Sequence, residues 1–388
     1  MRLISRFAIF LLFFAVACSP QAASPPQEPS PTSQSAVSVT PASSEELAES
    51  ESALPTAQNY RLRPGELVIA ANPDDIPAIF ANDSLFVDVS AGNAEWVDEE
   101  EVIGVWLNGE ARAYPIRLLS LHEIVNDNVG GQPIAVTWCP LCYSALVFSR
   151  VVEGRELSFG VSGFLFHNNL VMYDHQTDSL WSQVLAQAIK GAYNRESLDV
   201  LGATQTSWLA WKTEHPDTLV LSASQMGKQA DEVVDPYVGY YTSGAAGLGG
   251  QAERDERLPT QALVVGIKIG REERAYTFAD LRKLALINDE LGGIPILLVY
   301  NPKLNSVAAY ARLLDEQRLT FEISQEGRSF VDSDTASIWN IELGEAISGP
   351  LAGEGLSRLT APIVFWFAWS DIYPDTDIYE STILGEEE

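Results

Sequence analysis

Short apolar runs separated by turn residues recur along the chain after residue 100, and this pattern predicts short β-strands. Residues 102–107 and 111–115 are apolar-rich runs joined by Asn108-Gly109, a dipeptide that favours a tight hairpin turn. Further strands are predicted at residues 133–138, 145–150 and 157–161.

Two short helices are predicted between these strands. Residues 116–125 place Leu118, Leu121 and Val125 at the spacing of one helical face. Residues 207–214 carry two tryptophans and form the second predicted helix.

The second half of the chain repeats the first. Residues 104–150 match residues 266–312 at a constant shift of 162, and after a gap of four residues the match resumes at a shift of 158. The matched pairs include Tyr114 with Tyr276, Asn126 with Asn288, Trp181 with Trp339, and Trp211 with Trp369. Rare residues in one register indicate a tandem duplication. We therefore expect a strand-rich α+β fold of two similar units, each with small antiparallel or mixed sheets and a few short helices.

The amino terminus has the features of an export signal. Arg2 and Arg6 precede an apolar run at residues 7–17, which is too short to span a bilayer comfortably. The run ends in Ala15-Val16-Ala17-Cys18, which resembles a bacterial lipobox and predicts lipidation of Cys18. An ordinary signal peptidase site and an uncleaved anchor are the alternatives, and all three place the bulk of the protein outside the cytoplasm.

The next forty residues are rich in Ser, Pro, Ala, Gln and Glu, a composition that cannot bury a core and predicts a flexible tether. The predicted organisation is a signal peptide (1–17), the lipidated cysteine and tether (18–58), a first copy with an N-terminal extension (59–221), a connecting segment (222–260), and a second, degenerate copy (261–388). This organisation predicts an extracytoplasmic protein held to the membrane of the cell envelope by its lipid.

Charge narrows the classes of partner. The chain has 53 acidic against 24 basic residues, a formal net charge of -29. Such a chain repels phosphate backbones, so we do not expect nucleic acid as a partner. The chain also lacks a Walker loop, a dinucleotide fingerprint and an H-E-x-x-H motif.

The chemistry-bearing residues are confined to the first copy. Cys139 and Cys142 stand opposite Asn301 and Leu304, and His122 stands opposite Leu284. The other three histidines also lie in the first copy: His167, His175 and His215. Because a duplicated fold needs the same structural residues twice, the residues that differ are the best candidates for function.

The sequence Cys139-Pro140-Leu141-Cys142 has three interpretations. It forms a structural disulfide suited to an oxidising compartment, a thiol–disulfide exchange site, or half of a soft-metal site for copper or zinc. A metal needs further ligands, and His122 is the first candidate, with His167, His175 and His215 as weaker ones. His122 and His215 have an alternative role at helix ends.

Several motifs together resemble a bacterial exported family known as domain of unknown function 3179. They are Ile76-Pro77-Ala78-Ile79, Val102-Ile103-Gly104-Val105, Asn108-Gly109-Glu110-Ala111-Arg112-Ala113-Tyr114-Pro115, His122-Glu123-Ile124-Val125-Asn126-Asp127, Cys139-Pro140-Leu141-Cys142 and His215-Pro216-Asp217-Thr218. The resemblance covers nearly everything after the tether and implies export without implying a reaction. The chain departs from the family pattern at His167 and His175, which leaves Cys139, Cys142 and His122 as the best set.

Three functions follow as hypotheses. The first is an extracytoplasmic lipoprotein with a soft-metal (copper or zinc) or redox site in the first copy. The second is a thiol–disulfide oxidoreductase, and the third is a structural envelope protein with a C-x-x-C disulfide. The sequence leaves open whether the protein is an enzyme.

Overall fold

The computed structural model describes residues 62–248, 255–314, 317–324, 329–340 and 343–380, which belong to one compact unit. The predicted signal peptide, the predicted lipidation site Cys18 and the predicted tether lie outside these residues. Within the described ranges, no helix is long and apolar enough to cross a membrane.

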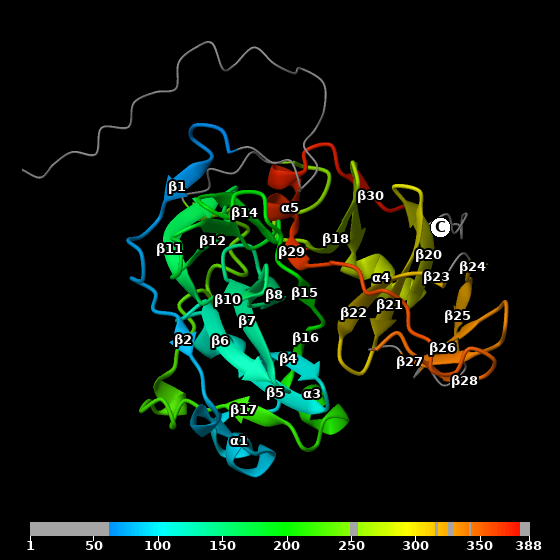
Figure 1. Cartoon of the computed structure of the whole chain (residues 1–388), viewed down its shortest axis with the longest axis horizontal. Coiled ribbons are helices and arrows are strands. Elements are labelled where there is room, and N and C mark those ends of the chain that lie inside the picture. Colours follow the sequence, from blue (N-terminus) through cyan, green and yellow to red (C-terminus); the bar gives the residue numbers. More distant parts are fainter. Residues whose placement is uncertain (1–61, 249–254, 315–316, 325–328, 341–342, 381–388) are drawn as a thin grey trace, which may run out of the picture. The chain divides into compact units, whose positions relative to one another are not determined.

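Strands dominate the described structure, with 44% strand and 13% helix, and six sheets form the blades of a β-propeller in a ring. The residues of the first copy, blue to green in Figure 1, supply three five-stranded sheets. In spatial order these are β1 (Leu67–Ile69), β11 (Phe159–Phe166), β12 (Asn169–Asp174), β13 (Leu180–Ser182) and β14 (Gln187–Lys190); β15 (Val200–Leu201), β8 (Ser144–Ser149), β7 (Gln132–Cys139), β6 (Ile124–Val129) and β2 (Ile79–Phe80); and β16 (Thr204–Ser207), β4 (Glu101–Leu107), β5 (Glu110–Pro115), β17 (Leu219–Leu221) and β3 (Phe86–Val87).

The residues of the second copy, yellow to red in Figure 1, supply the other three sheets. These are β29 (Ile363–Phe365), β18 (Leu263–Ile269), β19 (Glu272–Thr277) and β30 (Asp377–Ile378); β20 (Leu286–Leu291), β21 (Ile294–Asn301) and β22 (Ser306–Ala311); and β25 (Phe321–Ile323), β26 (Ser329–Asp332), β27 (Ile338–Asn340) and β28 (Ala346–Ser348). Each copy adds one small hairpin: β9 (Val151–Val152) with β10 (Arg155–Glu156), and β23 (Leu313–Leu314) with β24 (Gln317–Arg318).

The α-helices of the described residues are short and lie between strands. They are α1 (Val89–Glu95), α2 (Ile116–Leu119), α3 (Trp208–Glu214), α4 (Phe278–Leu284) and α5 (Trp366–Ile372), with 3-10 turns at Asp83–Leu85 and Ala230–Glu232. Helix α3 begins where the Ser207 side chain accepts a hydrogen bond from Ala210 N, the usual N-cap arrangement.

The expectation of an α+β fold built from two similar units is therefore wrong. The helix expected over residues 116–125 ends at Leu119, and Ile124 already begins β6. Ile124 and Val125 are both fully buried, in different clusters of the core, because this strand is covered on both faces. A strand buried on both faces reads as an apolar run, which periodicity does not separate from a helix.

Buried and partly buried polar side chains nevertheless repeat their hydrogen bonds in the two copies. Trp181 Nε1 donates to Asp174 Oδ2, and Trp339 Nε1 donates to Asp332 Oδ2, both at 2.9 Å. Arg112 and Tyr114 donate to Asp127, as Arg274 and Tyr276 donate to Asp289. Asn126 Nδ2 donates to Phe159 O, as Asn288 Nδ2 donates to Phe321 O. Trp211 Nε1 donates to Thr218, as Trp369 Nε1 donates to Thr376. The pairs matched in the sequence thus make equivalent contacts.

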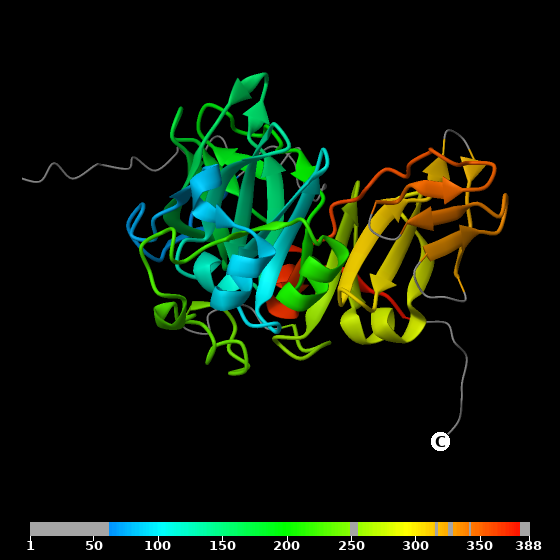
Figure 2. The ribbon, with the colours of Figure 1, turned by 90° about the horizontal axis from the view of Figure 1, so that it is seen from below.

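The two copies also share a core, which is a further reason why separate units do not describe the fold. One apolar cluster joins Phe148 and Trp181 of the first copy to Val364, Trp366 and Trp369 of the second. Both views place α5 between the sheets of the two copies (Figures 1 and 2). The first copy therefore completes its core with side chains supplied by the second.

Candidate functional site

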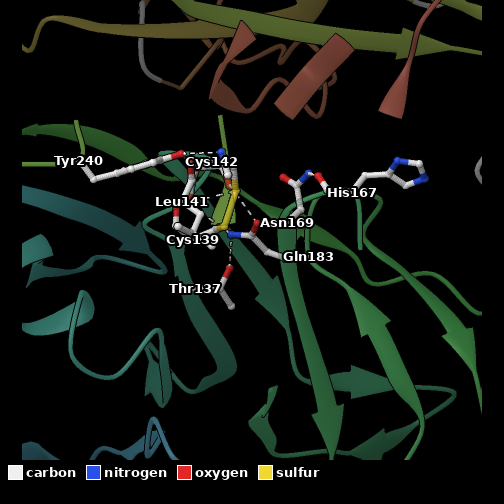
Figure 3. The surroundings of a disulfide bond; sticks show 10 residues. Thr137, Cys139, Leu141, Cys142, His167, Asn169, Gln183 and Tyr240 are labelled. Atoms are coloured by element: carbon white, nitrogen blue, oxygen red, sulfur yellow. Dashed lines mark hydrogen bonds between the residues drawn. A yellow bond between two sulfur atoms is a disulfide. The ribbon is translucent and has the colours of Figure 1, made fainter. Parts of the chain in front are cut away.

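The two cysteines lie in the hairpin turn between β7 and β8. Cys139 pairs with Ser144 at the end of the ladder, so residues 140–143 form the loop. Cys139 and Cys142 are joined by a disulfide, with 5.6 Å between their Cα atoms (Figure 3). Their exposed fractions are only 2% and 0%, so the disulfide is part of the shared core.

The second copy builds the same turn without a covalent bond. Asn301 pairs with Ser306, and Asn301 Oδ1 accepts hydrogen bonds from Lys303 N at 3.1 Å and Leu304 N at 3.4 Å. Tyr143 and Asn305, the last loop residues, have φ angles of 56° and 49°. In the second copy, the amide side chain of Asn301 thus closes the loop, whereas in the first copy the disulfide closes it.

Each turn is held by the opposite copy. Phe365 N, from the end of β29, donates to Cys142 O at 2.9 Å. Reciprocally, Thr206 Oγ1 from β16 donates to Leu304 O. The two turns therefore occupy equivalent positions in their own copies, each in contact with the other copy.

A network of buried polar side chains lies beside the disulfide. Gln183 Nε2 donates to Thr137 Oγ1 and to Ser144 O, both at 3.1 Å, and Ser144 Oγ donates to Gln183 Oε1 at 2.9 Å. Ser144 Oγ also lies 3.2 Å from Cys142 Sγ. All three polar side chains are fully buried. In the second copy Val299 stands where Thr137 does, so the network is not a general need of this fold.

Asn169, at the start of β12, is the other polar residue beside the disulfide. Its Nδ2 donates to His167 O at 2.7 Å, which fixes the orientation of the amide. Its Oδ1 is buried and has no hydrogen-bond donor among the described residues. A buried acceptor without a donor costs about 1–3 kcal/mol. Figure 3 shows this oxygen turned toward the disulfide.

The connecting segment (222–260) packs over the turn that carries the two cysteines. Tyr240 Oη donates to Leu141 O at 2.8 Å and accepts from Gly247 N at 3.1 Å. Ala246 is fully buried in the same apolar cluster as the cysteines. A reagent that attacks either sulfur therefore has to displace this cover.

Tyr143 links the turn to a set of aromatic and acidic side chains. Its ring centroid lies 5.0–5.2 Å from those of Trp138, Tyr241 and Phe365, and its hydroxyl donates to both carboxylate oxygens of Glu101. Burial raises the pKa of Glu101. Burial, with the negative charge of Glu101, raises the pKa of Tyr143 above its usual value, so the phenol stays protonated.

His122 occupies the turn before β6. Its Nδ1 lies 2.7 Å from Pro77 O, so Nδ1 carries a proton and donates, while the buried Nε2 has no partner among the described residues. Burial lowers the pKa of the ring, which favours neutral imidazole. The next residue, Glu123, is nearly buried with φ at 55°, and burial raises its pKa to about 8.

The predicted set of Cys139, Cys142 and His122 is brought together only in part. Trp138 N donates to Glu123 O at 2.8 Å, which places the turn of His122 beside the strand end that carries Cys139. Even so, no three His, Cys, Asp or Glu side chains of the described residues form a group able to hold a metal ion.

The three weaker histidine candidates have other contacts. His167 lies 3.5 Å from Asp371 and 3.8 Å from Glu66, and its ring points away from the disulfide (Figure 3). His175 Nδ1 lies 2.9 Å from Ser158 O. The His215 ring packs against Trp211 at the end of α3, with 4.0 Å between ring centroids and a tilt of 36°.

Sequence reasoning missed the polar residues around the disulfide, namely Asn169, Gln183 and Tyr240. Asn169 lies between Phe159 and Asp174, the stretch in which the shift between copies falls from 162 to 158. That local loss of four residues beside matched strands was the available signal. Tyr240 lies in the connecting segment, which has no counterpart with which to compare it.

Comparisons with known proteins give one match. No curated protein and no solved structure matches the chain. A family model described as "Protein of unknown function (DUF3179)" matches residues 73–376, well over half of the chain and parts of both copies. The chain therefore belongs to the DUF3179 family, as the sequence motifs indicated.

Proposed function

We propose that Cys139 and Cys142 form a redox site in an exported lipoprotein anchored through Cys18, and that the pair alternates between a disulfide and a dithiol. Export supports this proposal because disulfides persist in oxidising compartments outside the cytoplasm. The lipobox-like sequence before Cys18 supports the anchor.

The observation that carries the proposal is the second-copy turn. There the side-chain oxygen of Asn301 holds the same loop, in the same register, by accepting hydrogen bonds from the backbone amides of Lys303 and Leu304 instead of through a covalent bond. Closing so small a loop with a disulfide restrains little of the unfolded chain, about 2 kcal/mol on the chain-entropy estimate. The fold thus gains little from the disulfide that an amide does not provide.

The chemistry is a two-electron exchange with a thiol partner. A partner thiolate attacks one sulfur, the Cys139–Cys142 bond breaks, and a mixed disulfide forms. A second partner thiol then releases the oxidised partner and leaves both cysteines as thiols. Two electrons and two protons pass from the partner to the protein, and the reverse sequence returns them.

The contacts favour redox chemistry over a resident soft metal. A metal needs ligands beyond the two sulfurs, and His122 does not complete a group able to hold one among the described residues. The side-chain oxygens beside the pair, Ser144 Oγ and Asn169 Oδ1, have no negative or soft character that would suit copper.

The test is redox titration of the folded protein. Wild type would be equilibrated in glutathione buffers, its free thiols alkylated, and the fraction reduced measured by mass spectrometry, with tryptophan fluorescence reporting the fold. We expect the pair to become reduced while the fluorescence stays native. Reduction that occurs only together with unfolding would mean that the disulfide is structural.

The matched control is the second-copy turn itself. Cys139→Asn with Cys142→Leu places the second copy's residues in the first-copy turn. We expect this variant to fold, to lose about 2 kcal/mol of unfolding free energy, and to show no redox response. A variant that does not fold would contradict the proposal, because it would show that the first copy depends on the covalent bond.

A further inference from the structure

The surroundings of the disulfide are suited to thiols rather than to the disulfide that the structure contains. A disulfide sulfur carries no hydrogen, so it satisfies no acceptor, whereas a thiol donates one weak hydrogen bond. Ser144 Oγ lies beside the sulfur of Cys142, and Asn169 Oδ1 is turned toward the pair (Figure 3).

The first oxygen is Ser144 Oγ, 3.2 Å from Cys142 Sγ. Its single proton is directed to Gln183 Oε1 at 2.9 Å. The orientation of Gln183 is fixed in turn, because its Nε2 donates to Thr137 Oγ1 and Ser144 O. Ser144 therefore presents a lone pair to the sulfur.

The second oxygen is Asn169 Oδ1. The hydrogen bond from Nδ2 to His167 O excludes a flipped amide, because the flip would set two acceptors against each other. Asn169 is fully buried, its Oδ1 has no donor within the described ranges, and Figure 3 shows it turned toward the disulfide. The oxidised state leaves this acceptor unsatisfied.

We propose that Asn169 is a positioning residue that favours the reduced pair, by accepting a thiol hydrogen that exists only after reduction, while Ser144 accepts the other. This inference rests on the proposed redox function and adds its direction. A couple whose reduced form is stabilised is an oxidant. The protein therefore takes electrons from thiol partners, such as the reduced cysteines of other exported proteins.

The oxygens of Ser144 and Asn169 also bear on the protonation of the two cysteines after reduction. Acceptor oxygens beside the sulfurs interact more favourably with S–H groups than with thiolates, so this geometry favours neutral thiols. In balance, the disulfide and two partner thiols become two protein thiols and one partner disulfide. No further oxidant or reductant enters the step.

The experiment compares two buried amides. In Asn169→Leu the acceptor beside the disulfide is lost. In Gln187→Leu an amide of the same kind is lost elsewhere: Gln187 is fully buried, its Nε2 donates to Arg195 O at 3.1 Å, and its Oε1 has no donor among the described residues. Each full-length variant would be equilibrated with reduced and oxidised glutathione, and the fraction of reduced Cys139 and Cys142 measured by mass spectrometry.

We expect Asn169→Leu to lower the equilibrium constant for reduction about tenfold, equivalent to about 30 mV for this two-electron couple. Gln187→Leu should stay within about twofold of wild type, because general loosening of the fold affects both variants alike. Equal shifts in the two variants, or no shift in Asn169→Leu, would overturn the inference while leaving the redox site intact.

A measurement on wild type alone keeps the test decisive if Asn169→Leu does not fold. The infrared S–H stretching band of the reduced, folded protein should lie at lower frequency than that of the same protein unfolded in urea, because hydrogen bonding weakens the S–H bond. Two bands at the unfolded frequency would overturn the inference. A wild-type pair that stays oxidised until the protein unfolds refutes the proposed function itself, which is a separate outcome.

Discussion

The turn at residues 139–143 and its counterpart at residues 301–305 solve one structural problem in two ways. Both turns join two antiparallel strands whose last paired residues correspond, Cys139 with Ser144 and Asn301 with Ser306. Both end in a residue with positive φ, and each accepts a hydrogen bond from a backbone or hydroxyl donor of the opposite copy. The second-copy turn relies on the Asn301 amide, and the first-copy turn relies on a disulfide above a polar network. The difference teaches that the scaffold accepts either way of closing the turn and that, of the two turns, only the first-copy turn contains sulfur.

The largest effects should come from residues that the copies share. Asp174→Ala and Asp332→Ala each leave a buried tryptophan Nε1 and the hydroxyl and backbone donors of a threonine without an acceptor. We expect each variant to lose about 3–5 kcal/mol, with the two losses similar, as measured by urea unfolding.

The exposed Asp375 serves as the control, and Asp375→Ala should change stability by less than about 0.5 kcal/mol. If one of the two buried variants lost much more than the other, the copies would not contribute equally to the scaffold, and the comparison between their turns would lose its basis.

A second prediction concerns the residue before β6, which is Glu123 in the first copy and Ala285 in the second, with φ angles of 55° and 59°. Burial raises the pKa of Glu123 to about 8, from 4.5. The folded state therefore holds a proton that the unfolded state releases above pH 4.5. The stability associated with this proton is full below pH 4.5 and is lost as the pH rises toward 8.

Glu123→Gln removes this titration. We expect the variant to gain roughly 3–4 kcal/mol over wild type at pH 8 and little at pH 4, measured by urea unfolding across the pH range. Glu99→Gln, at an exposed position in the turn before β4, should show no such difference. An equal gain at both pH values would indicate a packing effect and not the buried charge.

The smallest effect tests the cover over the first-copy turn. Tyr240→Phe removes the hydroxyl that bonds Leu141 O and Gly247 N but keeps the ring. Losing about 1 kcal/mol of this contact should speed reduction of the folded protein by dithiothreitol about fivefold. Tyr241→Phe is the control, because its hydroxyl contacts Asp235, Ser120 and Trp138 and bonds no backbone atom of residues 140–143 among the described contacts. Equal rates in both variants would mean that the cover does not limit access to the sulfurs.

Individual strands and the internal repeat were open to prediction because they depend on local pattern. The hairpin at Asn108-Gly109 joins β4 and β5 as expected, and the pairs matched at a shift of 162 or 158 make equivalent hydrogen bonds. The fold class was not predicted, because the arrangement of the sheets in one ring depends on packing between the two copies, which no local pattern along the chain shows.

The candidate site divides in the same way. The sequence by itself determined the family, the doubled scaffold and the position of the cysteines, since these depend on residue identity and spacing along the chain. Only the tertiary structure decided that the cysteines are bonded and buried, that His122 does not join them in a metal-binding group within the described residues, and that Asn169, Gln183 and Tyr240 surround the pair. The physical reason is that these contacts join β7, β12, the residue after β13 and the connecting segment, which only packing against a shared core brings together.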